Sequence, residues 1–128
     1  MTRPPSISPS ELSVLSDLWD HPRSAGTEVH ARLSGETGWS VQTVKTMLAR
    51  LTDKGAVRAE RDGRRFLYTA VLERGTYARE ATRSLASKLF KGRAAPLVAN
   101  LVEDAPLSDE DLSELEALVA RMRAERGS

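Results

Sequence analysis

The chain has 128 residues, of which 40% are hydrophobic and none is cysteine. This length suffices for one compact domain, or for a small domain with an appendage. The lack of cysteine excludes disulfides and thiolate metal sites and is typical of a cytoplasmic protein. No apolar run is long enough to cross a membrane, and the N-terminal residues lack the hydrophobic segment of a secretory signal. We therefore expect a cytoplasmic protein with no membrane insertion.

The net charge of +1 hides an uneven distribution of charge along the chain. Residues 1–92 carry 15 basic and 10 acidic side chains, a net of +5, whereas residues 93–128 carry 4 and 8, a net of −4. This asymmetry indicates that any binding to a polyanion belongs to the first part of the chain.

Three short helices are predicted in the first half of the chain. The first begins after Ser8, which opens a Ser-x-x-Glu capping box with proline at the first helical position, and it ends at His21, which precedes a proline. The second covers residue 27 to about residue 37. The third begins after Ser40, a good N-cap, and ends before Gly55, which suits the left-handed position that follows many helices.

The third of these helices has two different faces. Apolar residues at i, i+3, i+4 and i+7 form one stripe that we expect to be buried: Val44, Met47, Leu48 and Leu51. The opposite face carries Gln42, Lys45, Thr46, Ala49, Arg50 and Asp53. Polar and basic side chains near the start of a helix can reach base edges and phosphates in the DNA major groove. Periodicity alone leaves an ordinary solvated helix face as the alternative.

Two strands are predicted after the third helix. Residues 57–61 alternate in polarity, residues 65–71 are interpreted as a second strand, and Asp62-Gly63 between them is a strong hairpin signal. Three helices followed by a two-stranded hairpin is the element order of a winged helix-turn-helix.

The tip of this hairpin carries three arginines that a turn does not need: Arg61, Arg64 and Arg65. We expect them to contact phosphates. They could instead be solubilising charges, and Arg61 in particular could pair with Glu60 or Asp62.

Three more helices are predicted toward the C-terminus: one over residues 72–91, a short one after Gly92, and a last one that begins after Ser108. Their apolar stripes exceed what one small winged-helix domain can cover, so a dimer interface is the economical interpretation. The residues expected to form it are Tyr77, Leu85, Leu89, Phe90, Leu97, Leu101, Leu112, Leu115, Leu118, Val119 and Met122. The predicted fold is mainly α with a small β-hairpin wing: a winged helix-turn-helix DNA-binding domain at 1–71 and a helical dimerisation domain at 72–128.

No catalytic or metal-binding constellation is found in the sequence. It has no Gly-rich phosphate loop, no cysteine nucleophile, and no Ser/His/Asp set whose members can be placed together. His21 and His30 lack acidic residues at ligand spacing, so helix-end packing is favoured over a metal site, and Trp19 and Trp39 are interpreted as packing residues rather than base-stacking platforms. We predict that the chain is not an enzyme and uses no cofactor.

Four segments of the chain resemble the BlaI/MecI/CopY family of bacterial winged-helix repressors. They are Trp39-Ser-x-x-Thr-Val-Lys-Thr-x-Leu-x-Arg-Leu-x-x-Lys-Gly55, Gly63-Arg-Arg-Phe-x-Tyr68, Leu89-Phe-x-Gly92 and Leu107-Ser-x-Glu-x-Leu112. The similarity covers roughly residues 7–119. It implies a homodimeric repressor that blocks transcription from short dyads built around TACA/TGTA.

The resemblance also implies roles for individual residues. By match to the motif, Thr43, Lys45 and Thr46 would face bases or adjacent phosphates, with Arg50 further along the same face. Arg64 and Arg65 would contact the DNA backbone near the wing.

The chemistry of the same helix start agrees with these roles. Lys45 can donate to guanine, and Gln42 can pair with adenine. The hydroxyl groups of Ser40, Thr43 and Thr46, with the free amides of the helix start, suit phosphate oxygens. A dimer would place two such helices about one DNA turn apart, so the operator should be palindromic.

The branches of the family that this chain resembles differ in how the repressor is released from DNA. Its beta-lactam branch implies proteolysis near an Asn-Phe bond by a membrane-bound sensor protease, and the nearest match here is Asn100-Leu101, which departs at the second residue. Its copper-responsive branch uses cysteine pairs, which this chain lacks.

Two other functions are compatible with a winged helix. A small-molecule-responsive regulator similar to the MarR family would need a polar pocket at the dimer seam, where the sequence shows mainly aliphatic residues. A protein-interaction module without DNA binding would show acidic or bulky apolar groups on the exposed face of the third helix, where only Asp53 is acidic.

Overall fold

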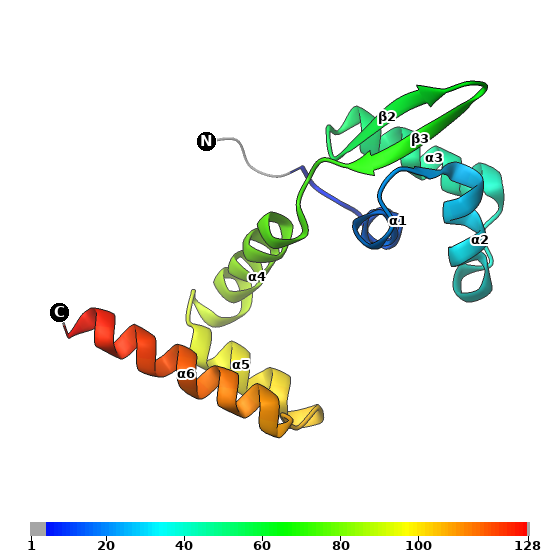
Figure 1. Cartoon of the computed structure of the whole chain (residues 1–128). Helices are drawn as coiled ribbons and strands as arrows, with labels where there is room; N and C mark the ends of the chain where they lie inside the picture. The colour runs from blue at the N-terminus through cyan, green and yellow to red at the C-terminus, as the bar shows by residue number, and fades with distance from the viewer. Residues whose placement is uncertain (1–4, 128) are drawn as a thin grey trace. The chain divides into compact units, whose positions relative to one another are not determined.

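The computed structural model describes residues 5–127, and within that range it has six helices and three strands. Figure 1 labels all of them except β1. They are α1 (Pro9–Asp20), β1 (Ser24–Ala25), α2 (Gly26–Thr37), α3 (Val41–Asp53), β2 (Val57–Asp62), β3 (Arg65–Ala70), α4 (Arg74–Phe90), α5 (Ala94–Asp104) and α6 (Asp109–Arg126). The chain divides into two compact units, the first ending at Thr82 and the second beginning at Arg83.

The helix boundaries follow the capping residues, as predicted. Ser8 Oγ accepts from the Glu11 amide at 3.1 Å while Glu11 Oε1 accepts from the Ser8 amide at 2.9 Å, a complete capping box. Ser40 Oγ accepts from the Thr43 amide at 3.1 Å at the start of α3. Past the end of α3, Gly55 has φ +79°, where a residue with a Cβ would be strained.

The three strands form one antiparallel sheet in the order β1-β3-β2. The hairpin of β2 and β3 was predicted, and here it is called the wing. Asp62 pairs with Arg65, so the loop between the strands consists of Gly63 and Arg64, one residue later than the predicted Asp62-Gly63 turn. Gly63 has φ +65°, which a two-residue hairpin loop requires of its first residue.

Strand β1 was not predicted from the sequence. It is two residues long and pairs with the outer edge of β3, with Ser24 opposite Tyr68 and Ala25 opposite Leu67. Such a short strand has no polarity alternation to detect. The order helix, short strand, two helices and hairpin is that of a winged helix-turn-helix, so the predicted fold class is confirmed.

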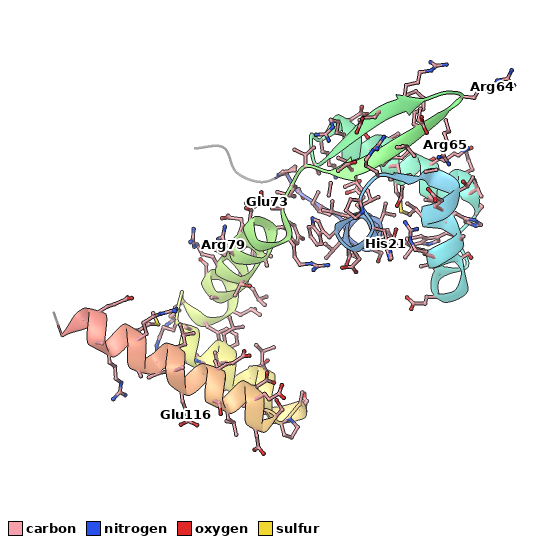
Figure 2. All side chains as sticks on the ribbon, in the orientation of Figure 1. His21, Arg64, Arg65, Glu73, Arg79 and Glu116 are labelled. Carbon is pink, nitrogen blue, oxygen red and sulfur yellow. The ribbon has the colours of Figure 1, made fainter. Side chains whose placement is uncertain are left out.

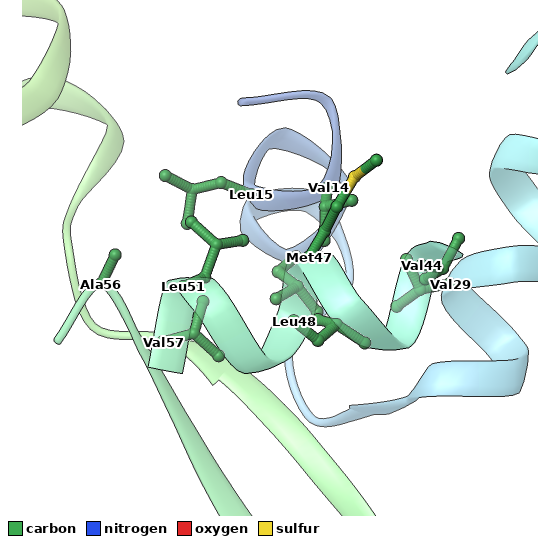
Figure 3. Close-up of a cluster of buried hydrophobic side chains, with 10 residues drawn as sticks. Val14, Leu15, Val29, Val44, Met47, Leu48, Leu51, Ala56 and Val57 are labelled. Atoms are coloured by element: carbon green, nitrogen blue, oxygen red, sulfur yellow. The ribbon is translucent and has the colours of Figure 1, made fainter. Parts of the chain in front are cut away.

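One apolar core holds the first unit together (Figure 3). Its buried members come from α1, α2, α3, the residue before β2 and the start of β2: Val14, Leu15, Leu18, Val29, Val44, Met47, Leu48, Leu51, Ala56 and Val57. The predicted inner stripe of α3 supplies four of them, three at 0% exposure and Met47 at 8%. This burial fixes which face of α3 remains outside.

Polar contacts add to the core where α1 meets α2. The Arg32 guanidinium of α2 donates to the Asp17 carboxylate of α1, with Nε to Oδ1 at 2.9 Å and Nη2 to Oδ2 at 2.8 Å. It also donates to Ser24 Oγ at 2.7 Å. The bond to Asp17 raises the pKa of Arg32 further above its usual range. A bidentate pair of this kind fixes direction as well as distance, so it orients α2 against α1.

The first turns of α4 are attached to α1 in the first unit. Trp19 Nε1 donates to the Leu72 carbonyl at 2.8 Å, and the Trp19 and Tyr77 ring centroids lie 6.2 Å apart. The Arg74 guanidinium carbon lies 5.3 Å from the Trp19 ring centroid, and Arg74 Nη2 donates to Asp20 Oδ1 at 2.8 Å. This bond lowers the pKa of Asp20.

The second unit contains the end of α4, then α5 and α6. Helix α4 ends where predicted, at Lys91 (φ +53°) and Gly92 (φ +80°), and the Gly92 amide donates to the Ala86 carbonyl at 2.9 Å. Ala86 and Leu97 are buried, whereas α6 contains no buried residue. Within residues 5–127, no helix is both long enough and apolar enough to cross a membrane.

Candidate nucleic-acid interface

The outer face of α3 is polar and positively charged. Gln42, Lys45, Thr46, Ala49, Arg50 and Asp53 are all exposed, as the sequence predicted. Among residues 5–127, neither Lys45 nor Arg50 forms an ion pair, so both cations are available to an anionic ligand. Asp53, the acidic member, lies at the far end of the helix.

Hydroxyl groups at the start of α3 bond to one another and to the helix backbone. Ser40 Oγ lies 3.0 Å from Thr43 Oγ1, and Thr46 Oγ1 donates to the Gln42 carbonyl at 2.9 Å. Phosphate oxygens only accept hydrogen bonds, so the Thr46 hydroxyl must leave the Gln42 carbonyl before it can donate to one. Lys45 and Arg50 need no such rearrangement.

The wing places its arginines at the tip and on both faces. Arg61 pairs in register with Phe66, and the adjacent pair joins Asp62 with Arg65. Because neighbouring pairs point to opposite faces of a sheet, Arg61 and Arg65 lie on opposite sides of the hairpin. Arg64 lies in the loop at the tip (Figure 2) and has no acidic partner among the described residues.

Contacts within the wing differ for its three arginines. The guanidinium carbon of Arg61 lies 5.7 Å from the Phe66 ring centroid, and its ion pair with Glu60 or Asp62, the alternative from the sequence, is not formed. Arg65 Nε lies 3.4 Å from Asp62 Oδ2, with the Arg65 side chain 59% exposed. An exposed pair of that length is weak. All three arginines are therefore accessible to a phosphate.

A histidine that the sequence placed at a helix end supports the segment before α3. His30 Nε2 of α2 lies 3.0 Å from the Trp39 carbonyl oxygen. Because a carbonyl only accepts, the Nε2 atom carries the proton in this bond. The contact fixes the chain one residue before the N-cap Ser40.

A charged contact that sequence reasoning missed anchors the other end of α3. Lys54 Nζ donates to Glu11 Oε1 at 2.5 Å and to the Ser6 carbonyl at 2.7 Å. The Glu11 side chain is only 4% exposed. The Lys54 bond, helped by the Ser8 amide, lowers the pKa of the Glu11 carboxyl. Lys54 therefore joins the end of α3 to the segment that precedes α1.

The residues predicted for dimerisation fall into different environments. Tyr77 packs on Trp19 in the first unit, and Leu97 is buried. Phe90 and Leu115 are half-buried. The others are between 40% and 65% exposed: Leu85, Leu89, Leu101, Leu112, Leu118, Val119 and Met122.

The proposed cleavage point lies inside a helix. Asn100 and Leu101 belong to α5 and both are exposed, Leu101 by 63%. Both side chains at the proposed cleavage point are therefore accessible to a protease, but the backbone around the bond is helical.

Comparison with known proteins agrees with this arrangement. Residues 7–121 match the family model described as penicillinase repressor. The penicillinase repressor of Bacillus licheniformis is 35% identical over 115 residues, which cover 90% of each chain. The solution structure of the DNA-binding domain of the repressor BlaI is 39% identical, with a TM-score of 0.53, over 60% of this chain and 94% of that one.

A second solved structure is similar over the same region. It is the monomeric form of B. licheniformis BlaI in complex with the blaP half-operator, 39% identical, with a TM-score of 0.52, over 60% of this chain and 94% of that one. The family consists of transcriptional repressors, which are regulators and not enzymes. With its winged helix, its exposed basic α3 face and a family match over most of its length, this chain belongs to the penicillinase repressor family.

Proposed function

We propose that the chain is a homodimeric repressor, acting in the cytoplasm, whose two copies of α3 read a palindromic operator of the TACA/TGTA type. The exposed face of α3 is the observation that supports this most strongly, because it presents two unpaired cations beside Gln42 and Thr46. The three arginines of the wing add phosphate-binding groups outside that face. BlaI, a relative with the same fold, is known in complex with a half-operator.

The second unit supports the dimer. Helix α6 spans 18 residues without one buried side chain, although it has an apolar stripe at helical spacing. A helix in water owes most of its stability to packing of such a stripe. Two open hollows along α6 are lined by apolar residues of this stripe, Leu112, Leu115, Val119 and Met122, together with Ala120 and the charged residues Glu116, Arg123, Glu125 and Arg126. Cover by the same face of a second copy would bury the stripe and give the two-fold symmetry that a palindrome needs.

Binding to matched DNA duplexes across a range of salt concentrations tests the proposal. A TACA/TGTA dyad should bind more tightly than a scrambled duplex of equal length, and the affinity for both should fall steeply with salt because several phosphates are neutralised. Equal affinity for the two duplexes would exclude sequence-specific reading.

Lys45→Ala tests the base contact on α3. If Lys45 donates to a base edge, its loss should cost about 1–3 kcal/mol of operator binding, which is roughly a 5- to 150-fold weakening, and should reduce the preference over scrambled DNA. The measurement is a titration of both duplexes at one salt concentration. Lys88→Ala is the matched control, since Lys88 is an exposed lysine on α4 in the second unit. An unchanged preference in the Lys45 variant would remove this residue from the interface.

Arg64→Ala and Arg65→Ala test the wing. Contacts to phosphates are independent of sequence, so each change should weaken binding to operator and scrambled DNA by the same factor. Each should also reduce the slope of log affinity against log salt concentration by about one. A change in specificity with an unchanged slope would contradict the phosphate assignment.

Proteolysis between Asn100 and Leu101 by a sensor protease remains a proposal for the release step. Proteases bind substrates in extended form, so α5 would have to unwind around this bond first. The exposure of both side chains supports access to the bond.

A further inference from the structure

Gly26, the first residue of α2, is covered by the side chain of Lys45. A methyl group at residue 26 would lie 3.4 Å from Lys45 Cγ and 3.7 Å from Lys45 Cε. The aliphatic part of Lys45 therefore runs along the glycine instead of projecting straight into solvent. Leu48 Cδ1, at 3.5 Å from the same point, closes the other side of this space.

The backbone at Gly26 does not require glycine. Positive φ occurs at Gly38, Gly55, Gly63 and Gly92 and not at Gly26, which is the first residue of α2 after the N-cap Ala25. In a helix, alanine is ordinarily more stable than glycine. The conformation of the chain therefore does not explain a small residue at position 26, whereas the Lys45 side chain lies at contact distance from that position.

The size of residue 26 then sets where Lys45 can lie. Separations of 3.4 Å and more are ordinary contact, so a methyl group fits beside the lysine, whereas a second or third carbon would occupy the volume of the lysine chain. A lysine chain that lies against the backbone of α2 also has fewer free rotamers to lose when its ammonium group binds.

We propose that Gly26 is a positioning residue for DNA recognition: its small size leaves the Lys45 chain room to lie against α2 and thereby directs the ammonium group of Lys45 toward the base that it reads. The inference rests on the proposed function, in which Lys45 contacts DNA. It adds a specificity-determining position on α2, outside the recognition face of α3.

A double-mutant cycle with Gly26→Leu and Lys45→Ala tests this positioning role. Gly26→Leu should weaken operator binding by roughly 3- to 30-fold and flatten the discrimination between operator and single-base variants. In the Lys45→Ala background the same change should have little further effect, because there is no lysine left to displace. Gly26→Ala is the matched control and should keep both affinity and discrimination.

The cycle also separates positioning from packing. A bulky residue that merely disturbs Leu48 would weaken binding equally with and without Lys45, and that result would overturn the inference. Gly26→Met, with an unbranched chain, repeats the test if Gly26→Leu unfolds, as judged by thermal unfolding. If Lys45→Ala keeps full operator affinity, the proposed base contact of Lys45 is refuted. If Lys45→Ala loses operator affinity and the effect of Gly26→Leu adds to that loss, only the role of Gly26 is refuted.

Discussion

Replacing Val119 and Met122 together by glutamate should make the protein monomeric and weaken its binding to a full palindromic operator by at least about 100-fold. Both side chains are about half exposed, at 49% and 57%, on a helix with no buried residue. In a dimer they would be buried, and two charges in an apolar interface are strongly unfavourable. Binding to a half-operator should stay unchanged, because each α3 face is intact.

The matched control for this variant uses the opposite side of α6. Ala117 and Ser113 lie away from the apolar stripe and are exposed, so Ala117→Glu with Ser113→Glu should leave the dimer and operator affinity unchanged. Analytical ultracentrifugation gives the oligomeric state, and titrations of full and half operators give the two affinities. A Val119/Met122 variant that remains dimeric would show that α6 is not the interface.

Removal of the cation beside Glu11 should destabilise the first unit. Lys54→Ala leaves a nearly buried carboxylate without its cation and with the Ser8 amide as its remaining donor, and we expect a loss of about 2–3 kcal/mol in the free energy of unfolding. Both tryptophans, Trp19 and Trp39, belong to the first unit, so their fluorescence during urea unfolding measures the stability of that unit alone. Lys88→Ala again serves as the control.

The pH dependence of this effect has a definite sign. The pKa of Glu11 is lower in the folded protein than in the unfolded chain, because Lys54 and the Ser8 amide stabilise the carboxylate. Its contribution to stability is therefore complete above the ordinary pKa of a glutamate and is lost as the pH falls through the lowered value. The difference in stability between wild type and Lys54→Ala should shrink over that acidic range. A difference that is constant with pH would mean that Lys54 acts through packing alone.

Local signals in the sequence were sufficient for most helix boundaries. Ser8, Ser40 and Ser108 each accept a hydrogen bond from an amide three residues on, as their positions before amphipathic segments predicted. The apolar stripe of α3 was predictable for the same reason, because the spacing of apolar residues and the capping of a helix both depend on residues within one or two turns. The exposed α3 face followed directly from that stripe.

Features that depend on distant parts of the chain were not predictable. The Lys54–Glu11 bond joins residues 43 positions apart, and nothing in the spacing of either residue indicates the other. Strand β1 exists only because the edge of β3 is free to pair. The covering of Gly26 by Lys45 depends on how α2 crosses α3, which no local pattern specifies.

The register of the wing has a consequence for the two strands of bound DNA. Arg61 and Arg65 extend from opposite faces of one hairpin. The two phosphate rows that border a minor groove are separated by a gap of about 6 Å. A hairpin presented to that gap can neutralise one phosphate on each strand instead of two on the same strand. Because Leu67 is buried and pairs with Ala25 of β1, the register of β3 is fixed, and the placement of Arg61 and Arg65 on opposite faces is fixed with it.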